Sequence, residues 1–408
     1  MTARASRSLS RPWWQRPGLA HRAGRLCLAG NDLEALARAG GTPLYVYDSG
    51  RILANLRRLR TALGSATGRH RIFYALKSNR FAPLLCALRV TGDCGVDVCS
   101  PEELLLARSC GFAEESISYT GTSMSEEDAR CLARHPKVIL NCDSLASLRR
   151  IARLSPGRAV GLRINPGLGL GYRQNRLLRY AGDDVSKFGI YLEQFPAALA
   201  LAEELGLRVE GLHFHTGCGF LTPQLPVLDR IFARAREFIR RLPALRYVNL
   251  GGGLGIPLVA GDQPLDLDAW SAVVRRHFGR ADFAVYLEPG DYLVKDAGVL
   301  LLEVNTVEEK AGTLFVGVDG GFNIHIEPSF YRLPLEPVPC VPPSAGAPVR
   351  RCTIAGNINE ALDVFARDVR LPLPREGDIL AFLNAGGYGS AMSSQHCLRG
   401  KFREFLLA

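Results

Sequence analysis

The segment Arg71-Ile-Phe-Tyr-Ala-Leu-Lys-Ser-Asn79 begins as a short apolar run, typical of a buried strand, and ends in polar residues. Similar runs recur over about 220 residues, separated by segments with the 3.6-residue period of amphipathic helices. Eight such alternations predict an α/β fold of the (β/α)8 barrel type. A doubly wound open sheet is the alternative, because periodicity does not separate the two. The expected strands are 72–75, 95–98, 116–119, 138–141, 160–165, 209–215, 247–250 and 284–287. The expected helices include 101–109, 125–133, 144–154, 192–205 and 225–242.

The sequence changes in character after the last of these strands. Gly- and Pro-rich turns now separate the apolar runs, which favours a separate C-terminal β domain over residues 291–408. Residues 334–348 are dense in proline and are predicted to be a loop. An earlier run at 44–48 leads us to expect that residues 31–50 supply strands to this domain. The barrel, residues 51–290, is then inserted in it. The strands expected in the β domain are 293–302, 314–319, 350–355 and 379–383.

The overall composition is that of a globular protein, with 47% hydrophobic and 22% charged residues among 408. No stretch approaches about 18 uncharged apolar residues, so no membrane span is expected. The 11 cysteines are scattered, odd in number and without a Cys-x-x-Cys motif. This pattern favours a reducing, cytoplasmic location over a disulfide framework.

The net charge of +10 is concentrated at the N-terminus. Residues 1–31 contain six arginines and no acidic residue, so the rest of the chain carries +4. No basic run interleaved with aromatic residues follows, and nucleic-acid binding is not expected. We interpret residues 1–30 as a disordered Arg-rich extension. An organelle transit peptide is the alternative, although Pro12-Trp-Trp14 and Pro17 interrupt any amphipathic helix there.

Residues capable of chemistry follow the predicted barrel strands. The C-terminal ends of all eight strands meet at one face of such a barrel, where catalytic groups lie. His213 and His215 share one face of a strand, so metal ligation is conceivable. No carboxylate stands at a helix-compatible spacing, and no metal is predicted. In strand order the candidates are Lys77, Asp97, Arg163 with Asn165, His213 with His215, Gly251 to Gly253, and Glu288.

Together these residue types suit pyridoxal phosphate. The Lys77 amine can form a Schiff base with a cofactor aldehyde, and the cofactor then acts as an electron sink for a carbanion. A Glu288 carboxylate can keep the pyridine nitrogen protonated, and His215 can stack on the ring. The Gly251–Gly253 turn can bring backbone N–H groups against a phosphate, and Tyr388 adds a hydroxyl donor.

The ordered motifs resemble the fold-type III pyridoxal-phosphate decarboxylases, the group of diaminopimelate and ornithine decarboxylases. The resemblance covers about residues 40–400. It implies an alanine-racemase-like barrel with a C-terminal β domain, and a head-to-tail homodimer with active sites at the interface. It also implies amino-acid decarboxylation. The matching motifs are Tyr74-Ala-Leu-Lys-Ser-Asn79, Val96-Asp-Val-Cys-Ser100, Ser186-Lys-Phe-Gly189, His213-Phe-His-Thr-Gly217, Gly251-Gly-Gly253, Glu288-Pro-Gly290 and Asp378 with Gly387-Tyr388-Gly389.

The resemblance also implies residue roles. By it, Lys77 is the Schiff-base lysine, His215 stacks on the cofactor ring and Glu288 pairs with the pyridine nitrogen. Asp97 and Arg163 support the cofactor. The rest of the implied cofactor-binding set is Cys218, Gly251, Gly252, Gly253, Gly290 and Tyr388.

Three positions depart from the family pattern. The family's Glu-Pro-Gly-Arg is here Glu288-Pro-Gly-Asp291, and an aspartate cannot bind a phosphate or a carboxylate as arginine does. The Cys-Glu or Cys-Asp pair that the partner subunit contributes is here Asn359-Glu360. Asparagine is a poor acid, so reprotonation must use water, Lys77 or another residue. Cys218 stands where a phosphate-binding serine is common. Catalytic roles are predicted for Asn359 and Glu360, and substrate contacts for Asp291, Tyr331, Asn359 and Glu360.

These departures bear on the substrate. Asp291 would repel a second carboxylate, which disfavours meso-diaminopimelate. Asp291 and Glu360 suit a distal ammonium, so our hypothesis is decarboxylation of a basic diamino acid such as ornithine or lysine, the D form included, or of a diamine conjugate of a siderophore-type pathway. Decarboxylation of meso-diaminopimelate in lysine biosynthesis is the alternative. An amino-acid racemase on the same barrel and a noncatalytic pyridoxal-phosphate carrier are further alternatives. A racemase motif is not evident, however, and carriers lack a β domain.

Overall fold

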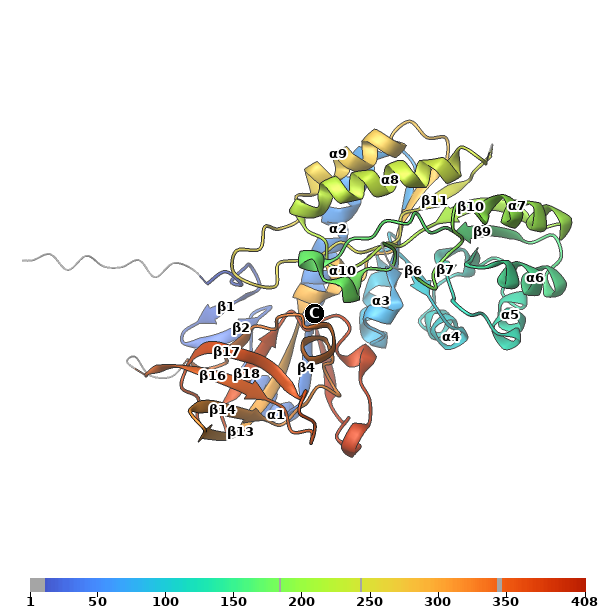
Figure 1. Ribbon diagram of the computed structural model, residues 1–408. Coiled ribbons are helices and arrows are strands. Elements are labelled where there is room, and N and C mark those ends of the chain that lie inside the picture. The colour runs from blue at the N-terminus through green and yellow to red at the C-terminus, as the bar shows by residue number, and fades with distance from the viewer. Residues whose placement is uncertain (1–11, 183–184, 243, 343–346) are drawn as a thin grey trace, which may run out of the picture.

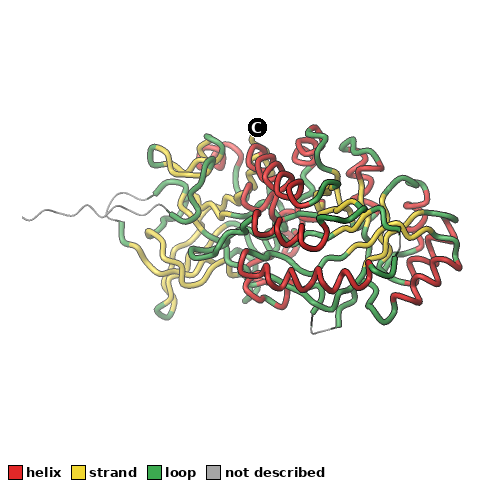
Figure 2. The backbone as a smooth tube through the Cα atoms, turned by 90° about the horizontal axis from the view of Figure 1, so that it is seen from above, coloured by secondary structure: helices red, strands yellow, loops and turns green. Residues whose placement is uncertain are grey.

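The computed structural model describes residues 12–182, 185–242, 244–342 and 347–408. A helix-covered barrel and a strand-rich domain pack against each other, and the view from above separates these two ends of the molecule (Figures 1 and 2). Eight parallel strands close the barrel in the order β10-β11-β12-β5-β6-β7-β8-β9. Closure confirms the predicted (β/α)8 fold and excludes the open doubly wound sheet.

The barrel strands match the apolar runs of the sequence to within one or two residues. Two strands end two residues earlier than expected, at Arg163 and His213, so that Asn165 and His215 lie in the loops beyond them. The strands are β5 (His70–Ala75), β6 (Gly95–Val98), β7 (Ile117–Tyr119), β8 (Ile139–Cys142), β9 (Ala159–Arg163), β10 (Arg208–His213), β11 (Tyr247–Asn249) and β12 (Ala284–Leu287).

Eight helices of the described chain cover the barrel, and local sequence explains where many of them begin. The hydroxyls of Ser125 and Ser144 accept hydrogen bonds from backbone N–H groups of the first turn, and a proline follows the cap residue Ser100. The first helix, α2, precedes the first strand and packs on α9. The helices are α2 (Ser49–Ala66), α3 (Ala82–Val90), α4 (Pro101–Ser109), α5 (Glu126–Ala133), α6 (Leu145–Leu154), α7 (Phe195–Glu204), α8 (Leu225–Ile239) and α9 (Leu267–Phe278).

The β domain combines strands from both ends of the chain. Strand β4 (Leu44–Asp48) pairs antiparallel with β13 and parallel with β19, so the predicted strand at 44–48 joins this domain (Figure 1). Its main sheet has the order β15-β18-β13-β14-β16-β17. The strands are β13 (Gly298–Lys310), β14 (Thr313–Val318), β15 (Pro337–Pro339), β16 (Val349–Ala355), β17 (Val364–Pro372), β18 (Ile379–Leu383) and β19 (Arg403–Leu407).

The expectation of a disordered extension over residues 1–30 is wrong for residues 12–30, and residues 1–11 lie outside the described residues. Strands β1 (Leu19–Arg22) and β2 (Arg25–Leu28) form an antiparallel hairpin that pairs with β3 (Asn31–Asp32). Trp14 and Leu26 are buried in the same apolar cluster as residues of β13 and β18. The apolar residues between the arginines are buried against the β domain, and this burial orders the segment despite its basic composition.

Three smaller predictions for the β domain are also wrong. Within residues 31–50, helix α1 (Leu33–Gly40) stands between two strands, and the Asp32 carboxylate caps it. The strand expected from residue 293 starts at Gly298, because α10 (Asp291–Val294) and a turn of 3-10 helix precede it. The proline-rich segment contains β15, which lies at the edge of its sheet, where missing N–H donors are tolerated.

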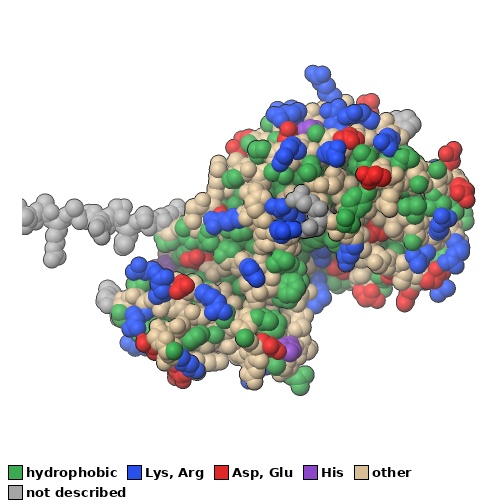
Figure 3. Space-filling view, viewed as in Figure 1, with side chains coloured by type: hydrophobic (Ala, Val, Ile, Leu, Met, Phe, Trp, Pro, Cys, Tyr) green, Lys and Arg blue, Asp and Glu red, His purple; other side chains and the backbone are tan. Residues whose placement is uncertain are grey.

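The surface does not concentrate charge on the face shown in Figure 3. Lysine and arginine side chains there are interspersed with acidic and apolar ones. Within the described ranges, no helix is both long and apolar enough to span a bilayer.

The burial of the N-terminal hairpin leads to a stability prediction. Leu26 is fully buried, so Leu26→Ala should lower the free energy of unfolding by about 2–5 kcal/mol in urea denaturation. Arg22→Ala, at an exposed position of the same hairpin, should change it by less than about 0.5 kcal/mol. Equal stabilities of the two variants would contradict a folded hairpin.

Candidate active site

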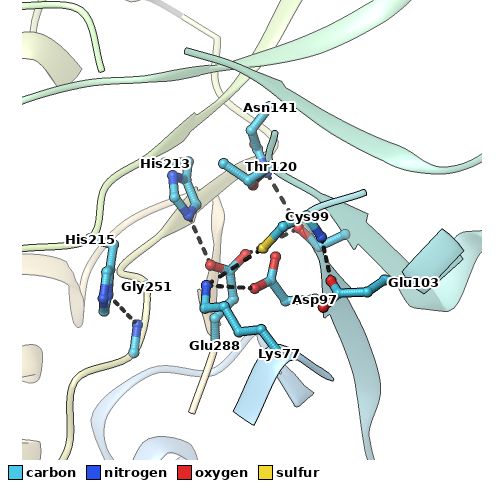
Figure 4. Close-up of polar contacts among 12 residues, drawn as sticks. Lys77, Asp97, Cys99, Glu103, Thr120, Asn141, His213, His215, Gly251 and Glu288 are labelled. Atoms are coloured by element: carbon cyan, nitrogen blue, oxygen red, sulfur yellow. Dashed lines mark hydrogen bonds and ion pairs between the residues drawn. The ribbon is translucent and has the colours of Figure 1, made fainter. Parts of the chain in front are cut away.

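Lys77 is presented by a single 3-10 turn, Leu76–Ser78, directly after β5. Its Nζ lies 3.6 Å from Asp97 Oδ2 and 3.7 Å from Cys99 Sγ (Figure 4). The side chain is 42% exposed, since it stands in a cavity at the C-terminal end of the barrel. Burial of the amine lowers its pKa, but the neighbouring Cys99, Asp97 and Glu288 outweigh burial and raise it. The groups around this amine therefore favour its protonated form.

Glu288 follows β12, and its carboxylate has three side-chain hydrogen-bond partners. Its Oε2 lies 2.8 Å from His213 Nε2, and its Oε1 accepts hydrogen bonds from Asn249 Nδ2 at 2.6 Å and Ser118 Oγ at 3.1 Å. Burial alone would raise the pKa of Glu288, but these contacts and Lys77 lower it to about 2. Burial lowers the pKa of His213, so a neutral imidazole donates to an ionised carboxylate.

Asp97 offers an unused acceptor to the cavity. Burial and the Glu288 carboxylate raise the pKa of Asp97, while Lys77 opposes them. Its Oδ1 atom is buried without a hydrogen-bond partner. Because an unpaired buried acceptor is costly, this oxygen is suited to a donor on a bound molecule.

The turn after β11 supplies backbone rather than side chains. Gly253 has φ +95°, and a Cβ on Gly252 would lie 2.1 Å from the carbonyl oxygen of Glu288, so neither position accommodates a larger residue. The Gly252 N–H donates to His215 Nδ1 at 3.2 Å. Burial lowers the pKa of His215 well below its ordinary value, and Lys77 and Arg163 add to this. A neutral, flat imidazole therefore forms one wall of the cavity.

One cavity of about 350 Å³ is lined by nearly all the predicted cofactor-binding residues. The amine, the buried carboxylates and the glycine turn fit pyridoxal phosphate, and the unpaired Asp97 Oδ1 adds an acceptor. Gly251 does not line the cavity; its carbonyl accepts a hydrogen bond from the Glu288 N–H at 2.7 Å. The predicted residues that line the cavity are Lys77, Asp97, Arg163, His213, His215, Cys218, Gly252, Gly253, Glu288, Gly290, Asp291 and Tyr388.

A second cavity of about 320 Å³ adjoins the first and shares Lys77, Cys218 and Tyr388 with it. Asp291 and Tyr331, predicted to contact the substrate, both line this cavity. Burial raises the pKa of the Cys218 thiol to about 12, and its Sγ lies 3.6 Å from His215 Nε2. Substrate and cofactor would thus meet where the two cavities join.

Asn359 and Glu360 are not brought to either cavity of the chain that carries them. Both side chains are exposed, and Glu360 Oε1 lies 3.3 Å from His396 Nε2. The sequence analysis predicts that these two residues reach the active site of a partner subunit, and this role stays a prediction.

Sequence reasoning missed four charged residues of the second cavity, namely Arg80, Glu103, Lys295 and Glu327. Lys295 lies between Asp291, at 3.5 Å, and Glu327, which it contacts closely; all three line the cavity. Burial and the Asp291 carboxylate raise the pKa of Glu327 to about 7, against the opposing effect of Lys295. The spacing of Lys295 and Glu327 could have indicated them, because residues four apart lie on the same face of a helix. Lys295 is four residues after Asp291, and Glu327 is four residues before Tyr331.

Comparisons with known proteins agree with this geometry. The family described as "Pyridoxal-dependent decarboxylase, pyridoxal binding domain" matches residues 49–295. Diaminopimelate decarboxylase of Methanothermobacter thermautotrophicus is 35% identical over 401 residues, covering 94% of this chain and 91% of the relative. The enzyme of that name from Streptomyces coelicolor is 32% identical, with 93% and 88% covered. The crystal structure of diaminopimelate decarboxylase from M. jannaschii superposes with a TM-score of 0.86 at 28% identity, covering 96% and 93%.

The fold and the site therefore define a pyridoxal-phosphate-dependent enzyme on a (β/α)8 barrel. The chain belongs to the fold-type III pyridoxal-phosphate-dependent decarboxylases, the family of the diaminopimelate and ornithine decarboxylases. It is a carboxy-lyase that acts on an amino acid with pyridoxal phosphate as cofactor. The racemase and carrier alternatives are set aside on this ground.

The position of Lys77 in both cavities leads to a second prediction. Lys77→Ala should lose measurable decarboxylation and, in the same preparation, the visible absorbance of covalently held cofactor. Lys137→Ala removes an exposed amine that pairs with Glu115 and should change neither property. Spectra and turnover of dialysed, cofactor-treated proteins test this, and retained turnover in Lys77→Ala would contradict the assignment.

Proposed function

We propose that this enzyme decarboxylates an amino acid whose far end carries an amine, either free, as in lysine or ornithine, or within a diamine conjugate. The observation that supports this substrate class is the Asp291–Lys295–Glu327 cluster in the cavity beside Lys77. The same cavity has an apolar wall that includes Leu178 and Ile256, which leaves room for a long or conjugated side chain.

Residues of the first cavity would hold the cofactor and set the charge around it. When bound, pyridoxal phosphate withdraws electron density from the substrate Cα and eases the loss of carbon dioxide. Lys77 supplies the amine that holds it, and Glu288 keeps a fixed negative charge in the barrel end. His215 provides a flat wall, while Gly252 and Gly253 leave backbone accessible for a phosphate.

The charges of the Asp291–Lys295–Glu327 cluster favour a cation, whereas Arg80 and Glu103, which also line this cavity, offset each other. With Glu327 ionised, two carboxylates face one ammonium and the cluster carries a net negative charge. At an effective dielectric of about 20, unit charges about 4 Å apart interact by about 4 kcal/mol, so a distal carboxylate would meet a substantial penalty. The Asp291 Oδ1 atom has no partner and is available to a substrate ammonium.

Meso-diaminopimelate is the second candidate substrate. Relatives that are 30–35% identical bear the name diaminopimelate decarboxylase, which favours it. Lys295 is a buried ammonium that lines this cavity, and it could receive a distal carboxylate if the carboxylates of the cluster were protonated. Arg80 adds a guanidinium to the same lining.

A substrate panel separates these candidates. Cofactor-loaded protein would be incubated with meso-diaminopimelate, both enantiomers of lysine, ornithine and arginine, and carboxylated diamine conjugates, and the products identified by mass spectrometry. We expect carbon dioxide loss from a member with a distal amine and no distal carboxylate. Efficient turnover of meso-diaminopimelate would overturn the proposed substrate class.

The raised pKa of Glu327 gives the same proposal a pH signature. Below pH 7 Glu327 is neutral and the cluster has no net charge; above it, the cluster is negative. The kcat/KM for a cationic substrate should therefore rise through pH 7, and its ratio to that of Glu327→Gln should grow by about five- to tenfold between about pH 6 and 8. A ratio that is flat across this range would remove Glu327 from substrate binding.

We also propose that the active enzyme is a homodimer in which Asn359 and Glu360 complete the site of the other subunit. Both residues are exposed on their own chain, and neither lines a cavity there. The location we propose for the enzyme is the cytoplasm, since all 11 cysteines are free thiols.

Subunit mixing tests the shared site. Lys77→Ala and Glu360→Ala should each be inactive alone, but random exchange puts one intact site in half of the dimers. Activity should then recover to about a quarter of the wild-type value.

The matched control mixes Lys77→Ala with Glu288→Gln. Both changes lie in the barrel part of one site, so no exchange restores an intact site. Recovery in neither mixture, after exchange has been verified by mass spectrometry, would contradict the shared site.

A further inference from the structure

A third cavity of about 200 Å³ lies beside the substrate cavity, and Gly255 and Ile256 line both. It is bounded by the N-terminal segment with Trp13 and Trp14, by helix α2 and by α10. We propose that this cavity is a binding site for a small organic anion, separate from the cofactor and substrate sites. The site stands independently of the substrate proposed above.

Positive charge exceeds negative charge in the wall of this cavity. Three guanidinium groups line it, those of Arg16, Arg51 and Arg58, against the single carboxylate of Asp296. Asp48 acts on Arg16 and Arg51 from outside the lining, which still leaves a net positive charge. Arg16 and Arg51 are half-buried and Arg58 is exposed, so the excess positive charge lies at the open side of the cavity and would attract an anion.

The Asp296 carboxylate is already engaged. Its Oδ2 accepts from Arg51 Nε at 3.0 Å, and its Oδ1 accepts from Asn55 Nδ2 at 2.8 Å. Arg16 instead donates to main-chain carbonyls, among them that of Trp14 at 3.2 Å. Within the described chain, Arg58 is exposed and forms no hydrogen bond or ion pair, and it acts electrostatically on the Tyr292 hydroxyl. Its guanidinium is therefore available to a ligand beside that hydroxyl.

Tyr292 gives an independent indication of a missing partner. Its side chain is 6% exposed, and its hydroxyl is buried with no hydrogen-bond partner, although it lines the cavity. Leaving a buried hydroxyl unpaired costs about 1–3 kcal/mol, and a ligand oxygen would satisfy it. A hydroxyl and a free guanidinium on one wall are the donors that a carboxylate or a phosphate group requires.

The remaining wall determines the rest of the ligand. Trp13, Ile256, Pro257 and Leu265 provide apolar surface, and a volume of about 200 Å³ holds only a small molecule. We therefore assign to this site a ligand with one anionic oxygen group and a short apolar body. The Pro12-Trp-Trp14 motif, which the catalytic site does not use, thereby gains a role as the cover of the cavity.

Tryptophan fluorescence tests the site directly, because two of the three tryptophans of the chain line this cavity. Cofactor-loaded protein, in which the phosphate cradle of the first cavity is filled, would be titrated with inorganic phosphate and, separately, with isobutyrate. We expect a saturable change with at least one of them, and phosphate against isobutyrate distinguishes the two head groups. Arg58→Ala and Tyr292→Phe should each weaken it by about tenfold.

Arg57→Ala is the matched control, since this neighbouring exposed arginine of α2 does not line the cavity and should leave the affinity unchanged. Trp13→Phe should reduce the signal while calorimetry still detects binding. No saturable change with either anion, or equal affinities in the Arg57→Ala and Arg58→Ala variants, would overturn the proposal.

Discussion

The ionised carboxylate of Glu288, buried at the end of the barrel, is the constraint on which the site depends. A buried charge of this kind costs several kcal/mol unless donors surround it. Here the donors come from three other strands: Ser118 on β7, His213 on β10 and Asn249 on β11. Only a closed barrel brings these strand ends to one point. The ionised state of Glu288 therefore depends on closure of the barrel.

The segment that follows Glu288 connects the barrel to the β domain. Three residues after Glu288 the chain forms α10, whose first residue, Asp291, faces the substrate cavity. Asp296, just beyond α10, accepts hydrogen bonds from Arg51 and Asn55 of α2 and so ties this segment to the barrel. Lys295 reaches Glu327 of the β domain in a buried ion pair. Any shift between the domains would therefore change both cavities, because Tyr388 of the β domain lines each of them.

Local sequence predicted the elements that repeat and missed those that depend on distant partners. The barrel strands were predictable because each is an apolar run followed by a helical period, and the residues after them, from Lys77 to Glu288, follow from topology alone. The N-terminal hairpin was missed because Leu26 and Trp14 are buried in a cluster that is completed by strands some 300 residues away in sequence. Strand β15 was missed because proline is tolerated only at the edge of a sheet, and an edge position is a property of the assembled domain.

Reaction and substrate are encoded by different residues in this chain. The groups that we propose to hold the cofactor, Lys77, His215 and Glu288, stand in motifs that match the family, whereas Asp291, in place of the family arginine, lines both cavities. The acidic change does not stand alone, because Lys295 is placed between Asp291 and Glu327 and offsets part of their charge. Such a cluster is neutral or negative according to pH, and the charge of the one guanidinium in the described lining of the second cavity, Arg80, is offset by the Glu103 carboxylate. The barrel thus retains the chemistry of amino-acid decarboxylation, and under our proposal the charge of this cluster selects the far end of the substrate.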